Sequence, residues 1–155
     1  MTQWIPFVRP RDSDALRKEL RTVAMSGIVA FAGEVRNDVL YPSEFIGTRT
    51  HALRGLEVLP SSGLGGHVVS SRRPAFVIDY RNSAQITHHY DSPVAAERLR
   101  TILAAPVVVQ RKTRAVLYIA NRDNARLDAL LERETLNAAH RLSMRSLSVT
   151  RSIGD

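Results

Sequence analysis

The densest group of side chains that could take part in chemistry is the run His88-His89-Tyr90-Asp91. Imidazole nitrogens and a carboxylate can bind a metal ion, and a single histidine can bind haem iron. Adjacent residues of a regular element point in different directions, however, and the sequence offers no third ligand at a spacing typical of a metal site. We therefore expect His88 and His89 to lie in a polar pocket wall or an exposed loop, and we predict neither metal nor haem there.

Three glycines, Gly63, Gly65 and Gly66, begin a short segment in which apolar side chains recur at helical spacing. Free N–H groups at a helix start attract anions, so a phosphate site is one interpretation. Residue 68 is Val68, where a dinucleotide-binding motif has its later glycine, and no Gly-Lys-Ser/Thr follows. We therefore predict that these glycines let a helix of about two turns pack closely on a sheet.

The composition argues against several classes of enzyme. The 155 residues contain no cysteine, which excludes thiol catalysis, thiolate metal sites and disulfide bonds. Ser70 and Ser71 do not lie in the strand–turn–helix context of a hydrolase nucleophile, and no pair of carboxylates stands out for acid–base catalysis. We predict that this chain is not an enzyme.

The chain is basic, with 22 Lys and Arg against 15 Asp and Glu and a formal net charge of +7. Such a surface attracts nucleic acid and other polyanions without specificity. The arginines are dispersed along the sequence, and no aromatic-rich strand that could stack on bases accompanies them. We interpret them mainly as solvated faces.

Hydropathy predicts no contact with a membrane. No apolar run approaches the roughly 20 residues that cross a bilayer, and residues 1–10 lack the apolar core of a signal peptide. We therefore expect a cytoplasmic protein.

The length and the 44% of hydrophobic residues fit one globular domain, 1–155. Apolar periodicity predicts a first helix over 12–26 and a C-terminal helix over 125–150. The sheet and the segments of a pocket are expected between them, over 28–121.

Within this middle part, alternation and turn residues predict two hairpins, at 28–47 and 102–120. A strand at 75–78 follows directly on the glycine-rich helix. Pro42 has no N–H for a sheet ladder and therefore predicts that the second strand of the first hairpin lies at an edge. One or two short helices are expected over 81–100.

The C-terminal helix is expected to be longer than the sheet. Residues 128–150 contain neither Gly nor Pro, and a helix of that length spans about 35 Å, against ~17–20 Å for a typical strand. The overhanging part, with Leu142, Leu147 and Val149, needs a partner, which is either a second copy or a following domain. The alternative is a frayed polar tail beyond Leu142.

Five short motifs follow one another along the chain: Gly63-Leu-Gly-Gly-His-Val-Val, Asp79-Tyr80, Ile86-Thr-His, Ala105-Pro-Val-Val-Val and Val116-Leu-Tyr. In their order and spacing they resemble the GAF domain. The resemblance covers about 12–150 and is closest to the N-terminal sensory GAF domain of LuxR-type (helix-turn-helix) transcription regulators.

The resemblance implies an α+β, profilin/PAS-like fold with an antiparallel sheet of five or six strands. The N- and C-terminal helices would pack on one face, while loops and short helices would form a ligand pocket on the other. Two copies would pair through the terminal helices as a homodimer. Contact with DNA would be made only by an attached domain that is not part of this sequence.

Seven residues are our candidates for lining the implied pocket, because together they supply aromatic walls, polar tips and one guanidinium that can bind a carboxylate. They are Phe45, Arg49, His67, Tyr80, His88, Tyr90 and Tyr118. Core packing is the alternative for Phe45 and Tyr118, and exposure to solvent is the alternative for Arg49 and His67. The candidates for the dimer interface are Leu16, Leu20, Leu131, Leu142, Leu147 and Val149.

The sequence also departs from several branches of the GAF family. The Asn-Lys-Phe-Asp-Glu signature of cyclic-nucleotide-binding GAF domains is absent. Without cysteine, neither an attached bilin nor the cysteine chemistry of free methionine sulfoxide reductases is available.

We therefore predict a non-catalytic regulatory domain that senses an unknown small molecule, as the signal-input part of a transcription regulator. Two alternatives stay open. One is a dimerisation module whose pocket is filled by its own side chains, and the other is direct binding of nucleic acid through the basic surface.

Overall fold

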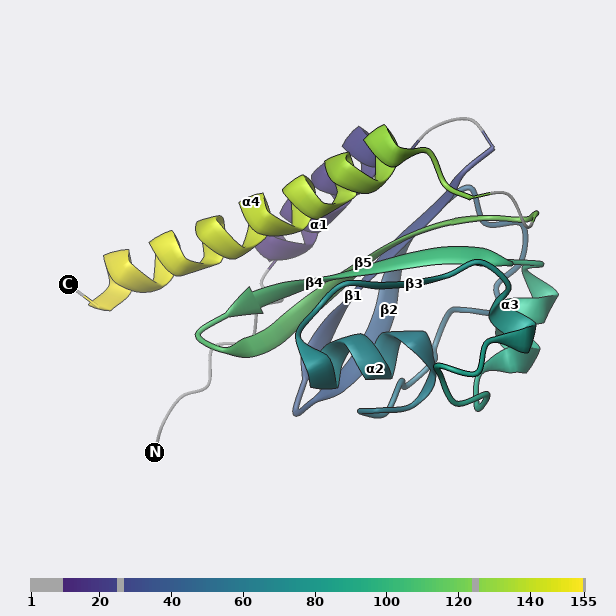
Figure 1. Ribbon diagram of the computed structural model, residues 1–155. Helices are drawn as coiled ribbons and strands as arrows, with labels where there is room; N and C mark the ends of the chain where they lie inside the picture. The colour runs from purple at the N-terminus through teal and green to yellow at the C-terminus, as the bar shows by residue number, and fades with distance from the viewer. Residues whose placement is uncertain (1–9, 25–26, 124–125, 155) are drawn as a thin grey trace.

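A computed structural model describes the backbone of residues 10–24, 27–123 and 126–154 and the side chains of 13–24, 27–123 and 126–145. Its centre is a five-stranded antiparallel sheet in the order β2-β1-β5-β4-β3 (Figure 1). The strands are β1 (Val29–Arg36), β2 (Val39–Ile46), β3 (Ala75–Val77), β4 (Thr101–Val109) and β5 (Lys112–Asn121). The predicted antiparallel α+β architecture is confirmed.

Both predicted hairpins are present. The turn between β1 and β2 places Asn37 and Asp38 at φ 53° and 66°, and the turn between β4 and β5 places Gln110 and Arg111 at the same pair of values. Two successive residues with positive φ form the tight turn whose twist matches that of the flanking strands. The prediction for Pro42 is also confirmed, because β2 is an edge strand.

The sheet is apolar on both faces. Along β5, Ala115, Leu117 and Ile119 belong to one core cluster. Val116 and Tyr118, which alternate with them, belong to the other. Because successive residues of a strand point to opposite faces, both faces of this strand need a cover.

The terminal helices α1 (Pro10–Val23) and α4 (Ala129–Gly154) cover one face, as the resemblance implied (Figure 1). The Arg141 guanidinium of α4 binds both carboxylate oxygens of Glu19 on α1, at 3.0 and 2.9 Å. The C-terminal part of α4 runs past the end of the sheet, so the predicted long helix is confirmed (Figure 1). No helix in the described ranges is long and apolar enough to cross a bilayer.

Four of the leucines expected at a dimer interface belong to the core of this chain itself. Leu16, Leu20, Leu131 and Leu142 are at most 4% exposed and pack between the terminal helices and the sheet. The apolar stripe of each helix is thus satisfied within one copy, and a contact between copies has to use other side chains. Leu147 and Val149 lie outside the described side chains.

The opposite face is covered by α2 (Gly63–Ser71), by the 3-10 helix η1 (Tyr80–Asn82) and by α3 (Asp91–Ala96). We call the segments 47–62 and 78–99 on this face the lid; the second of them includes η1 and α3. The predicted short helices are confirmed. Ser92 and Pro93 are residue types that suit the N-cap and the first helical position. The helix α3 nevertheless begins earlier, at Asp91, with Tyr90 as its N-cap residue. The segment 56–59 makes only a single bridge, from Val58 to Leu40.

The glycines of α2 allow the close packing that their spacing predicted. A Cβ atom on Gly65 would lie 1.9 Å from the Tyr118 hydroxyl and 2.9 Å from Leu40 Cδ2, and one on Gly66 would lie 2.2 Å from the Leu59 carbonyl oxygen. Such distances are far below van der Waals contact, so only glycine fits.

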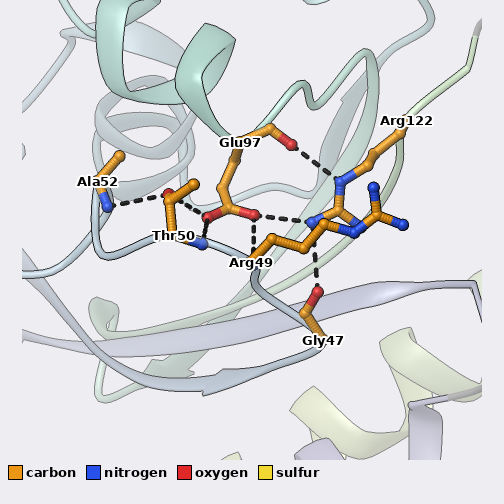
Figure 2. A network of polar contacts seen from close by, with 6 residues as sticks. All are labelled: Gly47, Arg49, Thr50, Ala52, Glu97 and Arg122. Carbon is orange, nitrogen blue, oxygen red and sulfur yellow. Dashed lines mark hydrogen bonds and ion pairs between the residues drawn. The ribbon is translucent and has the colours of Figure 1, made fainter.

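A buried carboxylate ties the two segments of the lid to the sheet (Figure 2). Glu97, 1% exposed, accepts hydrogen bonds from the Arg49 N–H at 2.9 Å, from the Thr50 N–H at 2.7 Å and from the Thr50 hydroxyl. Arg122, just after β5, donates from Nη2 to Glu97 Oε1 at 2.7 Å and from Nε to the Glu97 carbonyl at 3.0 Å. It also reaches the Gly47 carbonyl at 3.2 Å. The Glu97 side chain thus joins the start of the first lid segment, the end of α3 and the residue that follows β5.

These donors determine the charge of Glu97. Burial alone would raise the pKa of its carboxyl, but the hydrogen bonds from Arg49, Thr50 and Arg122 stabilise the anion and hold the pKa below its ordinary value of 4.5. The carboxylate is therefore charged at neutral pH.

Replacing Gly65 with Ala should destabilise the fold, because the added methyl meets the buried Tyr118 ring and cannot be moved into solvent. Overpacking of this kind costs about 1–3 kcal/mol, which is a fall of a few degrees in the melting temperature. The matched control is His67→Ala on the exposed outer side of the same helix, which should leave the melting temperature within about 1 °C. Equal melting temperatures for the two variants would contradict the close packing.

Replacing Glu97 with Gln should lower the stability at neutral pH by about 2 kcal/mol, because several donors lose a charged acceptor inside the protein. Thermal unfolding checks this, with Glu57→Gln, an exposed glutamate of the same lid, as the control. A group whose folded pKa is depressed contributes stability above its unfolded pKa and loses it as the pH falls through the folded value. The difference between wild type and Glu97→Gln should therefore shrink below pH 4.5. A difference that stays constant in acid would show that the charge plays no part.

Candidate functional site

A small hollow lies between the sheet and its lid. Its volume is about 40 Å³, and its walls come from β1, β2, β4, β5, α2, α3, η1 and the first lid segment. Apart from three tyrosines, the side chains that line it are apolar. The lining residues are Phe31, Pro42, Leu53, Leu56, Val58, Leu64, Gly65, Tyr80, Tyr90, Val94, Ile102 and Tyr118.

Two of the tyrosines form the floor and one wall of this hollow. The ring of Tyr118, on β5, stacks on Phe31 of β1 with centroids 4.2 Å apart. Burial raises the pKa of Tyr80 to about 12 and raises that of Tyr118 as well. Both phenols are therefore neutral at physiological pH, and each presents a hydroxyl that can donate or accept a hydrogen bond.

Tyr90 joins the two lid segments. Its hydroxyl accepts a hydrogen bond from the Leu59 N–H at 2.9 Å and donates one to the Glu57 carbonyl at 3.2 Å. The ring closes the hollow from the side of α3. Breaking these two bonds is what an opening of the lid at this point would require.

His88 lies behind Tyr80 and does not line the hollow. Its Nδ1 is 2.8 Å from Asp91 Oδ1 and its Nε2 is 2.7 Å from the Ser83 carbonyl oxygen. Both partners are acceptors, so these contacts favour the protonated ring, in which both nitrogens donate. The hydrogen bond to Asp91 accordingly raises the pKa of His88. The ring meets that of Tyr80 edge to face at 6.2 Å.

The neighbouring His89 does not complete a metal site. Its Nδ1 lies 3.3 Å from both the Thr87 and the Ser62 hydroxyl oxygens. Within the residues that the structure describes, no three His, Asp or Glu side chains gather closely enough to hold a metal ion.

Besides His88, three more of the seven pocket candidates do not line the hollow. The ring of Phe45 stacks on that of Phe31, with centroids 6.3 Å apart. The Arg54 guanidinium lies over the Phe45 ring, 4.7 Å from its centroid. Arg49 contributes its backbone N–H to Glu97, while the residue itself is exposed. His67 points away from the sheet on the exposed side of α2. The sequence does not give the orientation of these side chains, which lie on a strand, a loop and a helix surface respectively.

A second, larger hollow adjoins the first on the far side of Tyr80 and Val94, which line both. It is a cleft of about 520 Å³ between η1, α3 and the start of β4. Four arginines and two carboxylates give it its charge. They are Arg81, Arg98, Arg100, Arg122, Asp79 and Asp91.

Neither this cleft nor the role of Glu97 was predicted from the sequence. The dispersed arginines were interpreted as solvated faces, although Arg81, Arg98 and Arg100 share one short polar segment of the sequence. That local density was the available signal. Glu97 gave none, because a lone glutamate at the end of a short helix is common on surfaces.

Comparison with known proteins agrees with this fold. The family model of the GAF domain matches residues 14–145. Two solved structures are similar in fold: a GAF domain from a phosphoenolpyruvate-protein phosphotransferase of Coxiella burnetii and the reduced fRMsr of Staphylococcus aureus. The first has a TM-score of 0.66 at 15% identity and covers 92% of this chain and 95% of its own. The second has a TM-score of 0.66 at 16% identity, covering 85% and 80%.

A relative with a described role is also similar in sequence. The HTH-type transcriptional activator RamA of Corynebacterium glutamicum is 37% identical over 131 residues, which are 82% of this chain and 47% of that protein. The chain thus spans about half the length of this curated relative. Since the family model covers most of the sequence and the sheet, helices and lid have the corresponding architecture, this chain belongs to the GAF domain family.

Proposed function

We propose that this chain is a non-catalytic sensory domain that binds a small molecule beneath its lid and passes the signal to an attached DNA-binding domain. The observation that carries the proposal is the hollow between sheet and lid, whose lining side chains are apolar apart from three tyrosines. Apolar walls with a few convergent polar groups are the usual composition of small-ligand sites. The similarity to a transcriptional activator supports the regulatory role.

The walls define the chemistry of the ligand. No charged side chain lines this hollow, and the phenols of Tyr80 and Tyr118 are neutral. A ligand group that enters it should therefore be mainly apolar, with one or two hydrogen-bonding atoms. A volume of about 40 Å³ holds only a short group, because one water-sized probe already needs ~10–15 Å³. Short-chain acids and their acyl thioesters have such a group.

The small volume also favours a second candidate function. If the side chains of Tyr118, Phe31 and Leu64 already fill the space, the domain would serve only as an interaction module. Direct nucleic-acid binding remains a third candidate, on the strength of the net charge of +7. It predicts an affinity that falls steeply with salt.

The proposed partner is a second copy of this chain, bound through the outer side of α4. Leu130, Leu136 and Met144 are 64%, 39% and 53% exposed there, facing away from the core. Leu130 and Met144 are about four turns apart and thus share one stripe. Covering such a stripe with the same stripe of another copy removes apolar surface from water on both sides.

Isothermal titration with short-chain carboxylates and their coenzyme A thioesters tests the sensory function. We expect saturable heat with the unaltered chain and about tenfold weaker binding to Val58→Phe, because the larger ring occupies the hollow. The matched control is Leu59→Phe, the neighbouring exposed residue, which should bind as the unaltered chain does. Circular dichroism confirms that both variants fold.

Two outcomes would reject this use of the hollow. If no compound of the panel binds, the interaction module is the better explanation. If Val58→Phe and Leu59→Phe bind equally well, the ligand sits elsewhere on the molecule.

Sedimentation equilibrium tests the dimer. Met144→Glu should weaken self-association by about tenfold, because a carboxylate would be buried without a partner. Leu59→Glu on the lid is the control, since both parent side chains are 53% exposed. A monomeric unaltered chain at all accessible concentrations, or equal effects of the two variants, would contradict the proposed face.

A further inference from the structure

The arginine-lined cleft beside η1 and α3 has more positive charge than its own carboxylates neutralise. Each of three carboxylates at the cleft has a partner: Glu97 contacts Arg122 at 2.7 Å, Asp91 contacts His88 at 2.8 Å, and Asp79 contacts Arg100 at 3.8 Å. Two guanidiniums remain, those of Arg81 and Arg98. Neither has an ion pair or a hydrogen bond with any residue in the described part of the chain.

Arg98 occupies a position where the backbone favours glycine. At the end of α3 the Arg98 N–H binds the Ala95 carbonyl at 2.9 Å and the Leu99 N–H binds the Val94 carbonyl at 3.1 Å. These bonds close the helix with a left-handed residue, and Arg98 has φ 60°. Glycine is the usual residue at such a position, since a side chain there strains the backbone. The residue in this strained position is an arginine that lines the cleft.

From these observations we propose that the cleft binds a small dianion, held by Arg81 and Arg98. Two uncompensated guanidiniums match two negative charges, and the guanidinium fork binds carboxylate and phosphate oxygens through paired hydrogen bonds. The cleft's 520 Å³ lies within the range of about 300–1,000 Å³ for small-molecule sites. A concave site of this size favours a small molecule over the extended backbone of a duplex.

The proposal goes beyond the sensory function, because the cleft is a separate hollow from the one beneath the lid. Tyr80 and Val94 separate the two. A dianion in the cleft would lie beside Tyr80, which also lines the inner hollow. The dianion chemistry is shared by phosphate monoesters and short dicarboxylates.

Thermal unfolding and isothermal titration at about pH 8, where inorganic phosphate and succinate are both dianions, test the site. Ionic strength is held constant with sodium chloride. We expect saturable binding at low millimolar concentration and a rise in melting temperature. Phosphate also stabilises proteins by exclusion from their surface, so the variants decide the result. Arg81→Gln and Arg98→Gly should each weaken binding about tenfold.

Arg98→Gly has a second signature that simple loss of structure would not give. Removing the side chain relieves the left-handed backbone, so the melting temperature without ligand should rise by about 2 °C while binding of the dianion falls. The matched control is Arg133→Gln, an exposed arginine of α4, which should bind as the unaltered chain does.

The outcomes separate the sources of the dianion. Binding of phosphate alone or succinate alone supports the site and assigns it to phosphate esters or to dicarboxylates. Absence of binding by either, or equal binding by the Arg81, Arg98 and Arg133 variants, overturns the proposal. So does binding of a short DNA duplex that needs Arg81 and Arg98 when neither small dianion binds. The variant Val58→Phe leaves this site intact, so failure here is distinguishable from failure of the sensory function.

Discussion

The central strands have apolar side chains on both faces, and this constraint governs the arrangement of the whole molecule. The β5 residues from Ala115 to Ala120 are all buried, although they alternate between two separate core clusters. On one face the cover is simple, because α1 and α4 satisfy their own backbone hydrogen bonds and offer apolar stripes. On the other face the cover is irregular, and its polar groups need partners supplied from outside the segment.

Glu97 is the main such partner. Its carboxylate accepts hydrogen bonds from the first lid segment, while Arg122 binds the same carboxylate and the carbonyl oxygens of Glu97 and Gly47. A buried charge is costly unless it is well paired, and here the pairing also fixes the ends of three segments at one point. The lid can therefore lie over an apolar hollow without a regular hydrogen-bonded frame of its own.

The hollow is small because α2 approaches the sheet so closely. Gly65 leaves room for the Tyr118 hydroxyl, and the Tyr118 ring lies flat on Phe31. The larger open space is the cleft beyond Tyr80, which is lined by arginines. An apolar inner hollow and a charged outer cleft thus share one wall, formed by Tyr80 and Val94.

Periodicity and turn chemistry were sufficient to predict the elements in the order and approximate bounds in which they occur, together with the edge position of β2. These are local properties: positive φ at a two-residue turn, an N–H missing at Pro42, an apolar stripe repeating along a helix. Of the residues singled out in the sequence, Tyr80, Tyr90 and Tyr118 line the hollow. Tertiary structure alone decided that Phe45, Arg49, His67 and His88 lie outside the hollow. It also decided that the helix leucines are satisfied within one copy and that Arg81 and Arg98 border a cleft. The physical reason is that loop orientation and the depth of a side chain depend on contacts between segments distant in the chain, and such contacts leave no period in the sequence.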